Sequence, residues 1–289
     1  MMNPETAHFF WHGRPLSVYE RACMASFVRQ GFAVNLWCFD ALNVPAGIVR
    51  RDAAEILPRS DLGKYTQGGM KANITAFSDA FRFTLLSKEP GWWFDCDVVC
   101  LRQSADFTAL AAGKNIVCGR EDRKTISVGV LHIPDTSLQH DLLEELATSG
   151  TDFPWAYIGP GLLTRVLTRL NLQSVAQPPQ AFYPVSYLAP LLALHPDKIA
   201  EIQRLCQGAY TYHLWNEILR RLAIPKNILP PEGSWLHQEF IKALPEAAHL
   251  PCLEVSTLNA LTPLPSVKRR VKEVILGILN LIESTFQKR

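Results

Sequence analysis

The sequence predicts an α/β fold with a Rossmann-like β-α-β start, a central mixed sheet and a helical or irregular C-terminal part. Three observations support this prediction. The first forty residues show a strand–helix–strand pattern, residues 92–101 are almost continuously apolar, and residues 177–231 are proline-rich and irregular. The 289 residues, of which 48% are hydrophobic, are enough for one large α/β domain with a complete core.

The β-α-β unit is predicted from turn and capping residues. Residues 8–11 form a short apolar strand, and Ser17 and Glu20 have the spacing of a helix capping box. Gly31 suits the position just after a helix end, and residues 33–39 follow as the second strand. We expect these strands to pair in parallel through a right-handed crossover. Ligands of such sheets bind beyond the carboxyl ends of the strands.

The remaining elements are predicted from hydrophobic periodicity. Residues 71–88 have apolar residues at four-residue spacing and predict a helix that Pro90-Gly91 ends. Residues 92–101 then predict one buried strand, interrupted only by two aspartates. Further strands are expected at 115–119 and 125–133, and further helices at 137–149 and 162–170.

Charge and cysteine content narrow the class of protein. A formal net charge of +2 does not indicate a nucleic-acid binder, which would carry a basic stripe. The seven cysteines show no zinc-ligand spacing, so we expect a reducing, cytoplasmic compartment. We also expect no signal peptide, because the N-terminus lacks a basic and then apolar segment. A membrane-spanning helix is not expected either, since no run of about 18 apolar residues occurs.

Asp95 and Asp97 are the strongest candidates for chemistry. Residues i and i+2 of an extended chain point to the same side, so the two carboxylates should converge while Cys96 points away. Two carboxylates at the end of a buried strand are costly unless a positive charge lies between them. A divalent cation, Mn²⁺ or Mg²⁺, meets that need and keeps room for phosphate oxygens. The alternative is a solvated acidic pair.

The preceding helix adds an Asp–Arg pair. Asp79 and Arg82 stand three residues apart, directly after Ser78, on a face opposite the aromatic stripe. Such a pair is usually a surface salt bridge of little energetic value. Its place just ahead of the aspartates favours sugar binding, in which Asp79 accepts hydrogen bonds from sugar hydroxyls. Arg82 would orient Asp79 and offset pyrophosphate charge.

Together these motifs resemble the sugar-binding DxD region of a glycosyltransferase superfamily. The pattern is Ser78-Asp79-x-x-Arg82, an apolar helix end, Gly91, an aromatic pair and Asp-x-Asp, preceded by an opening block at residues 10–17. The superfamily includes bacterial capsule and lipopolysaccharide sugar transferases, yeast-type initiating α-1,6-mannosyltransferases and clostridial glucosylating toxins. The resemblance covers about the first hundred residues and implies a GT-A fold.

The resemblance implies roles for the residues of these two blocks. Trp11 would stack on the nucleotide base, with Gly13 and Ser78 in the same nucleotide-sugar site. Asp97 would bind the cation directly, and Asp95 would hold the metal and the ribose. Asp79 and Arg82 complete the catalytic and cofactor-binding set.

Two later segments resemble further blocks of the superfamily. Residues 212–216 resemble a His-x-Trp segment, so His213 would complete the cation shell or bind phosphate, with Asn216 as a further cofactor contact. The structural alternative is a hydrogen-bonded histidine beside a core tryptophan. Gly159-Pro160-Gly161 would offer backbone N–H groups to the sugar or the acceptor, or simply begin a helix.

One departure concerns the tyrosine that usually precedes DxD and helps hold the sugar phosphate. The segment here is Pro90-Gly91-Trp92-Trp93-Phe94, which has no tyrosine hydroxyl.

These expectations describe a metal-dependent retaining hexosyltransferase of surface polysaccharide synthesis. It would move a sugar from a nucleotide sugar, UDP-linked in preference to GDP-linked, to a saccharide or glycolipid acceptor, with the leaving phosphate as base. The alternative is a non-catalytic nucleotide-sugar-binding protein of a polysaccharide-synthesis complex. A phosphohydrolase is disfavoured, because it would show more acidic or histidine ligands near the aspartates.

The expected organisation is one catalytic domain and a terminal helix. The domain spans residues 1–265, with 177–231 as its lid or acceptor region, and residues 266–289 form a basic amphipathic helix. That helix would lie on an anionic membrane surface or pack on the body. We therefore expect a cytoplasmic protein, peripheral at the inner face of the membrane in the first case. The sequence does not predict the oligomeric state.

Overall fold

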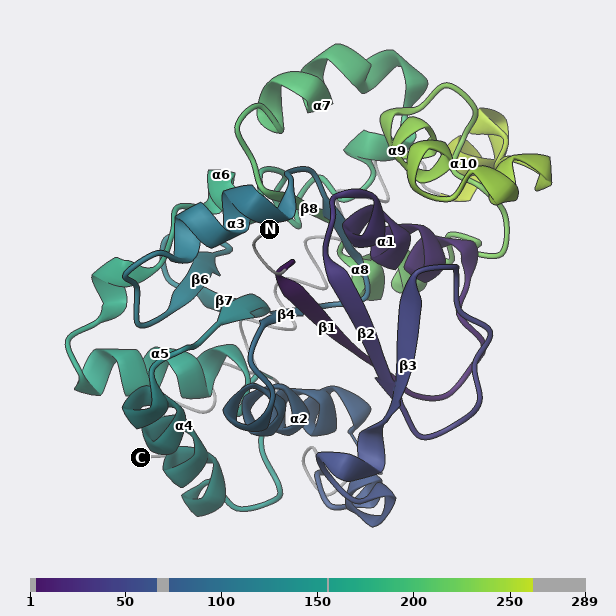
Figure 1. Cartoon of the computed structure of the whole chain (residues 1–289). Coiled ribbons are helices and arrows are strands. Elements are labelled where there is room, and N and C mark those ends of the chain that lie inside the picture. Colours follow the sequence, from purple (N-terminus) through teal and green to yellow (C-terminus); the bar gives the residue numbers. More distant parts are fainter. Residues whose placement is uncertain (1–3, 67–72, 155, 262–289) are drawn as a thin grey trace.

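The computed structural model describes residues 4–66, 73–154 and 156–261 (Figure 1). Its centre is a six-stranded mixed sheet in the order β3-β2-β1-β4-β7-β6. The first four of these strands run parallel, whereas β7 is antiparallel to both of its neighbours. Their bounds are β1 (Thr6–Trp11), β2 (Ala33–Cys38), β3 (Ile48–Asp52), β4 (Trp92–Phe94), β6 (Val117–Arg120) and β7 (Ile126–His132). The predicted α/β fold with a mixed sheet is confirmed.

Helices cover both faces of this sheet, as Figure 1 shows. One face is covered by α1 (Val18–Arg29) and α3 (Ser104–Ala111), and the other by α2 (Ile74–Lys88), α4 (Thr136–Thr148) and α5 (Pro160–Arg169). Successive strand residues point to opposite faces, so Phe9 packs on Phe27 of α1 while Phe10 packs on Phe81 of α2. A strand buried on both faces reads as a nearly continuous apolar run, and β1 does so apart from Thr6 and His8.

A second, two-stranded sheet lies beside the first. It pairs β5 (Val98–Cys100) antiparallel with β8 (Thr211–His213), so two segments more than a hundred residues apart in the sequence lie side by side. The C-terminal helices are α6 (Pro179–Phe182), α7 (Ile199–Leu205), α8 (Asn216–Arg221), α9 (Trp235–Ala243) and α10 (Val255–Leu261). Short 3-10 helices are η1 (Ala53–Glu55), η2 (Arg59–Gly63), η3 (Gln173–Val175), η4 (Leu192–Leu194), η5 (Pro196–Lys198) and η6 (Pro245–His249).

The C-terminal part builds a hydrophobic cluster of its own against α1. Tyr19 of α1 packs edge-on against Phe240 of α9, and Tyr212 of β8 packs against Trp235. Residues 177–231, expected as a lid or acceptor region, contribute side chains to this cluster. The boundary at residue 265 stays a prediction, because the amphipathic helix at 266–289 lies outside the described residues.

The early part of the chain follows the prediction closely. Ser17 and Glu20 form the expected capping box at the start of α1, and Gly31 has a φ of +82°, as the residue after a helix end often does. Helix α2 begins at Ile74 after the N-cap Asn73; the predicted start at residue 71 lies outside the described residues.

The prediction of one strand over residues 92–101 is wrong. The chain turns at the two aspartates, where the Val98 N–H donates to the Asp95 carbonyl oxygen (3.1 Å), so β4 and β5 belong to different sheets. The short β8 and the edge strand β3, with its exposed Val49 and Arg50, were not predicted. Three residues are too few for a recognisable alternation, and β3 has little apolar character.

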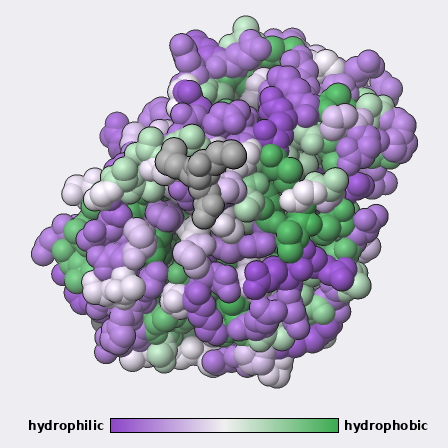
Figure 2. Space-filling model, in the orientation of Figure 1, coloured by the Kyte–Doolittle hydropathy of each residue, from purple (hydrophilic) through white to green (hydrophobic). Residues whose placement is uncertain are grey.

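The surface is mixed in character. The face in Figure 2 is largely hydrophilic, with hydrophobic residues gathered near the place where Figure 1 has α1, β2 and β3. Val49, 56% exposed, lies on β3 at this edge of the sheet. Among the described helices, none has the length and apolar character needed to cross a membrane.

Candidate functional site

The turn between β4 and β5 places two carboxylates at the carboxyl edge of the parallel strands. The Asp95 N–H donates to the Gly129 carbonyl oxygen (2.9 Å), and the Leu214 N–H donates to the Asp97 carbonyl oxygen (2.9 Å), so both sides of the turn are fixed. The Cys96 side chain points away, and its Sγ lies 3.2 Å from the Phe10 carbonyl oxygen. The aspartates converge as predicted, but a tight turn brings them together rather than an extended strand.

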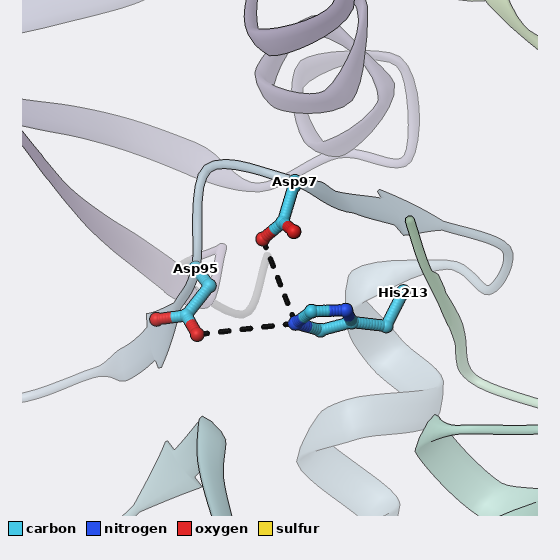
Figure 3. Close-up of side chains that lie close together, drawn as sticks. All are labelled: Asp95, Asp97 and His213. Carbon is cyan, nitrogen blue, oxygen red and sulfur yellow. Dashed lines mark ion pairs between the residues drawn. The ribbon is translucent and has the colours of Figure 1, made fainter. Parts of the chain in front are cut away.

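His213 of β8 completes a three-residue group with these aspartates (Figure 3). Its Nε2 lies 3.5 Å from Asp97 Oδ1 and 3.9 Å from Asp95 Oδ2. One potential ligand atom from each residue lies within 4.8 Å of the others. Two carboxylates and one imidazole are a suitable donor set for Mn²⁺. The residues therefore fit a divalent cation.

Electrostatics within the group follow from burial and charge. Burial alone would raise the pKa of Asp95, but the Arg82 guanidinium, His213 and Trp93 lower it to about 2. Burial and the neighbouring Asp95 raise the pKa of Asp97, against the effect of His213. Burial would lower the pKa of His213, but the two aspartates outweigh it and raise that pKa. The group therefore attracts positive charge, as a cation site must.

Arg82 joins this group to Asp79. Its NH1 lies 3.0 Å from Asp95 Oδ1, and its NH2 lies 3.1 Å from Asp79 Oδ1. Arg82 also donates to the Val128 carbonyl oxygen (2.6 Å) and lies over the Trp93 ring. Asp79 and Arg82 are each 4% exposed, so the usual expectation of a surface salt bridge is wrong here. Through Arg82, this buried pair on α2 is in direct contact with Asp95.

Asp79 faces the start of α5, where Gly159 precedes Pro160. A Cβ on Gly159 would stand 2.4 Å from Asp79 Oδ2, so the carboxylate lies directly against the glycine backbone. Burial raises the pKa of Asp79 to about 7, with Arg82 opposing and Asp95 adding to the shift. Asp79 can thus accept or donate a hydrogen bond near neutral pH. The predicted Gly-Pro-Gly block lies beside Asp79, and it also begins α5.

The loop after β8 holds both His213 and Asp97. Trp215 has a left-handed backbone (φ +58°), and its N–H donates to His213 Nδ1 (3.0 Å). The next N–H, of Asn216, donates to Asp97 Oδ2 (2.8 Å). Because Nδ1 accepts, the proton of a neutral His213 ring sits on Nε2, which faces the carboxylates. A cation bound at Nε2 would have to replace that proton, and the neutral ring would then carry its proton on Nδ1 and lose the hydrogen bond from Trp215.

A buried ion pair that the sequence prediction missed supports this loop. Asn216 Nδ2 donates to Glu20 Oε1 (2.9 Å), and the same carboxylate is paired with Lys226 and bonded to Ser17. Glu20 is 1% exposed. Its capping-box role was visible from local spacing. Its partners Asn216 and Lys226 lie about two hundred residues away in the chain, and no local pattern indicates them.

The structure gives the local contacts of the other predicted nucleotide-sugar residues. Trp11 ends β1, is half-buried, and donates through Nε1 to the Arg14 carbonyl oxygen (2.7 Å). Gly13 follows with a φ of +103°, a conformation that favours glycine. Ser78 accepts from Arg82 through its carbonyl oxygen (3.3 Å). No hydrogen bond or ring contact within the described chain joins Trp11 to the aspartates, so base stacking stays a prediction.

The tyrosine that usually precedes the DxD motif is replaced here by Phe94, and another tyrosine, Tyr183, lies near His213. Phe94, at the position before Asp95, is buried against Phe27 and provides no hydroxyl. Tyr183, at the end of α6, was not singled out, yet its ring lies 5.7 Å from the His213 ring. Burial raises the pKa of Tyr183, against the effect of the nearby Ser127 hydroxyl. Its phenol therefore keeps its proton.

The family model matches a segment that lies mainly in the second half of the chain. Residues 134–229 match the family model described as "Alpha 1,4-glycosyltransferase conserved region". This stretch holds Gly159, Tyr183, His213 and Asn216, whereas Asp79 to Asp97 lie before it. It thus complements the resemblance found in the first hundred residues.

Curated relatives and solved structures were compared with the chain as well. Lactosylceramide 4-alpha-galactosyltransferase from Pongo pygmaeus is 25% identical over 159 residues, covering 50% of this chain and 68% of the relative. The Homo sapiens protein of that name is also 25% identical over 159 residues, 50% of this chain and 42% of its own length. Among solved structures, the WbbM bifunctional glycosyltransferase has a TM-score of 0.48 at 10% identity, covering 87% of this chain and 50% of that chain. The sequence matches relate this chain to the glycosyltransferases.

Proposed function

We propose that this chain is a metal-dependent retaining hexosyltransferase that uses a nucleotide sugar. The observation that carries the proposal is the meeting of Asp95, Asp97 and His213 within 4.8 Å, with the buried Asp79–Arg82 pair joined to Asp95. A metal site alone would suit many enzymes. The Asp–Arg pair adds groups that bind hydroxyls beside it, and the matched relatives are sugar transferases.

In this proposal the chain's own residues hold and orient the donor. Asp95 and Asp97 hold Mn²⁺ or Mg²⁺ with His213, and Asp79 accepts hydrogen bonds from sugar hydroxyls. Arg82 fixes Asp79 and Asp95 relative to each other, since it contacts both. Trp11 stacks on the base, with Gly13, Ser78 and Asn216 around the nucleotide sugar. A bound divalent cation neutralises charge on the leaving diphosphate.

The reaction is assigned to retention of configuration. Asp79, Asp95 and Asp97 each form an ion pair with Arg82 or His213, and in this proposal none of them acts as the base. We propose that the leaving phosphate oxygen takes the acceptor proton, and that retention of the configuration of an α-linked donor gives an α-linked product. The printed names of the relatives, which specify a 4-alpha-galactosyl transfer, support this linkage and favour UDP-galactose as donor.

The acceptor and the location complete the proposal. The relatives' names specify lactosylceramide, which supports a glycolipid acceptor ending in a sugar. A saccharide of a surface polysaccharide is the other acceptor of the same chemistry. We propose a cytoplasmic protein that works at the inner face of a membrane, where a lipid-linked acceptor would be presented.

A donor screen tests this proposal. The purified full chain is incubated with UDP- and GDP-sugars, with and without Mn²⁺, and followed by thermal shift and by release of nucleoside diphosphate. One donor should stabilise the protein and be hydrolysed only with Mn²⁺; saturation at a hundred times Kd gives about 2.7 kcal/mol. Asp97→Asn should lose both effects, while Asp197→Asn, an exposed aspartate on η5, should keep them.

Two outcomes contradict the proposal in different ways. Donor binding that depends on Mn²⁺ without hydrolysis or transfer would indicate a non-catalytic nucleotide-sugar-binding protein. Failure to bind or hydrolyse any of the sugars, with Asp97→Asn behaving as the parent, would overturn the site itself.

A further inference from the structure

Tyr183 carries a buried hydroxyl that the described chain leaves without a hydrogen-bond partner. The residue is 2% exposed, and its Oη is among the buried polar atoms that have no partner. The Ser127 hydroxyl lies nearby, but it accepts from the Gly129 N–H (3.3 Å) and does not meet hydrogen-bond geometry with Tyr183. An unsatisfied buried hydroxyl costs about 1–3 kcal/mol, so its presence calls for an explanation.

The Tyr183 ring packs beside two residues of the segment that holds His213. Its ring, at the end of α6, lies 5.7 Å from the His213 ring and 5.8 Å from the Trp215 ring, and those two rings lie 4.4 Å from each other. These contacts fix the ring from the side of the loop that follows β8. The contact with His213 places the Tyr183 side chain beside the candidate cation site.

Gly129 shows how close this hydroxyl comes to Asp95. A Cβ on Gly129 would stand 3.0 Å from Asp95 Oδ2, 3.2 Å from Tyr183 Oη and 3.5 Å from His213 Cδ2. Gly129 has no left-handed φ, so its backbone conformation does not require glycine. The reason for a glycine at this position is steric. A side chain on residue 129 would stand between the Asp95 carboxylate and the Tyr183 hydroxyl.

The two oxygens of Asp95 are held unequally. Oδ1 accepts from Trp93 Nε1 (2.9 Å) and contacts Arg82 NH1 (3.0 Å). Oδ2 faces His213 Nε2 at 3.9 Å, which is beyond hydrogen-bond distance. Carboxylates that bind metals are commonly fixed by hydrogen bonds from a second layer of residues. Asp95 Oδ2 thus needs a donor on the side where Tyr183 lies.

We propose that Tyr183 is a positioning residue for Asp95. Among the described residues this hydroxyl has no partner; when a divalent cation binds, it would donate to Asp95 Oδ2 across the space above Gly129 and so fix this carboxylate. The inference rests on the proposed function, since it concerns the same cation site. It adds Tyr183 and Gly129 to that site, and it gives both residues a role in metal affinity rather than in chemistry.

The test measures Mn²⁺ affinity of the full chain without any sugar nucleotide, by calorimetry or by the spin-resonance signal of free Mn²⁺. Tyr183→Phe keeps the ring and removes only the hydroxyl. It should weaken Mn²⁺ binding about tenfold or more, the usual cost of losing such a second-layer contact. Its melting temperature should stay the same or rise, because the variant lacks an unsatisfied buried group. A merely structural tyrosine would not weaken metal binding.

Tyr212→Phe is the matched control. Tyr212 is 1% exposed and directly precedes His213, but its ring packs on Trp235 in the other hydrophobic cluster. This variant also loses one buried phenolic hydroxyl. Its Mn²⁺ affinity should equal that of the parent.

A double-mutant cycle tests the path across Gly129. Gly129→Ala should weaken Mn²⁺ binding, and Tyr183→Phe should then have little further effect, because the methyl group already blocks the contact. Fully additive losses would overturn the proposal. So would a Tyr183→Phe effect that disappears in a Ser127→Ala background, since Ser127 would then be the partner of the hydroxyl.

The failure of this inference is distinguishable from that of the proposed function. If the parent chain binds Mn²⁺ and Tyr183→Phe binds it equally well, only the role of Tyr183 is wrong. If the parent chain does not bind Mn²⁺ at all, the cation site itself is wrong.

Discussion

The carboxylate of Asp79 occupies the place that a side chain on Gly159 would need. A Cβ there would come within 2.4 Å of Asp79 Oδ2 and 2.7 Å of Oδ1. Helix α5 thus begins against the residue proposed to bind the donor sugar. The glycine lets α2 and α5 approach each other at this point, and the sugar-binding carboxylate is fixed from both sides, by Arg82 and by the backbone of residue 159.

Gly159→Ala should therefore lower activity more than stability. The added methyl group must push the Asp79 carboxylate aside, and a displacement of about 1 Å near a reacting group can cost about a hundredfold in rate. We expect a loss of that order in kcat/KM for donor hydrolysis with Mn²⁺. Gly63→Ala is the control, because no atom lies within 4 Å of a Cβ built there. Equal kinetics for the two variants would show that Asp79 does not need its present position.

Lys226 should contribute to the free energy of unfolding through its ion pair with the buried Glu20. Glu20 is 1% exposed and paired with Lys226, so Lys226→Met would leave a buried carboxylate without its counter-charge. Removing one partner of such a pair costs about 3–5 kcal/mol of unfolding free energy. The additional change Glu20→Gln should restore part of this loss.

Urea unfolding measures this effect, with Lys198→Met as control. Lys198 and Glu201 form an ion pair in which each side chain is 45% exposed. Such a surface pair contributes about 0–1 kcal/mol. A loss of similar size in both lysine variants would mean that the Glu20 pair behaves as a surface pair.

The pH dependence of stability should report on Asp79. Its pKa is raised by burial to about 7, so between the ordinary value of 3.8 and about 7 the folded protein binds more protons than the unfolded chain. Stability contributed by this group must fall as pH rises through that window. Asp79→Asn cannot ionise, so the difference in melting temperature between variant and parent should grow from pH 5 to pH 8.

The size of that difference is measurable by thermal unfolding. Each kcal/mol shifts the melting temperature by about 2–4 °C in a domain of this size. We expect the variant to be relatively more stable at pH 8 while losing donor hydrolysis. A constant difference across the pH range would mean that Arg82 keeps Asp79 ionised throughout.

The parts of the fold that local patterns encode were predictable. Three such patterns are the capping box of Ser17 and Glu20, the glycine after the end of α1 (Gly31) and the apolar period of α2. Each depends on residues within one turn or a few turns of helix. The turn at Asp95 to Asp97 was missed, because apolar residues on both sides make two short strands look like one. Strand β8 is too short for any period to show.

The candidate site also consists of residues that local patterns predict and residues that only the fold brings together. Asp79, Arg82, Asp95 and Asp97 lie within twenty residues, and their spacing indicated a shared site before the structure did. Tyr183 and Lys226 act on that site only through contacts between distant segments. Their neighbours in sequence give no sign of this, because the pairing of β5 with β8 and the packing of α1 bring the segments together.

His213 should make Mn²⁺ binding depend on pH. Burial would lower its pKa, but Asp97 and Asp95 outweigh burial and raise it. The ring therefore keeps its second proton, and its positive charge, to higher pH than an ordinary histidine. That proton competes with a cation at Nε2. Mn²⁺ affinity should therefore rise with pH through the neutral range, and binding should release protons. His213→Asn should bind Mn²⁺ more weakly at pH 8 and show a flatter pH dependence.

Calorimetry in buffers of different ionisation enthalpy counts the released protons. His249→Asn, a change on the exposed turn η6, should keep the pH dependence of the parent. If His213→Asn shows the same proton release and the same affinity as the parent, His213 does not bind the cation. The Trp215 N–H bond to Nδ1 would then explain the histidine as a structural residue that shapes the loop around Asp97, and the cation would be held by the two aspartates and the donor diphosphate.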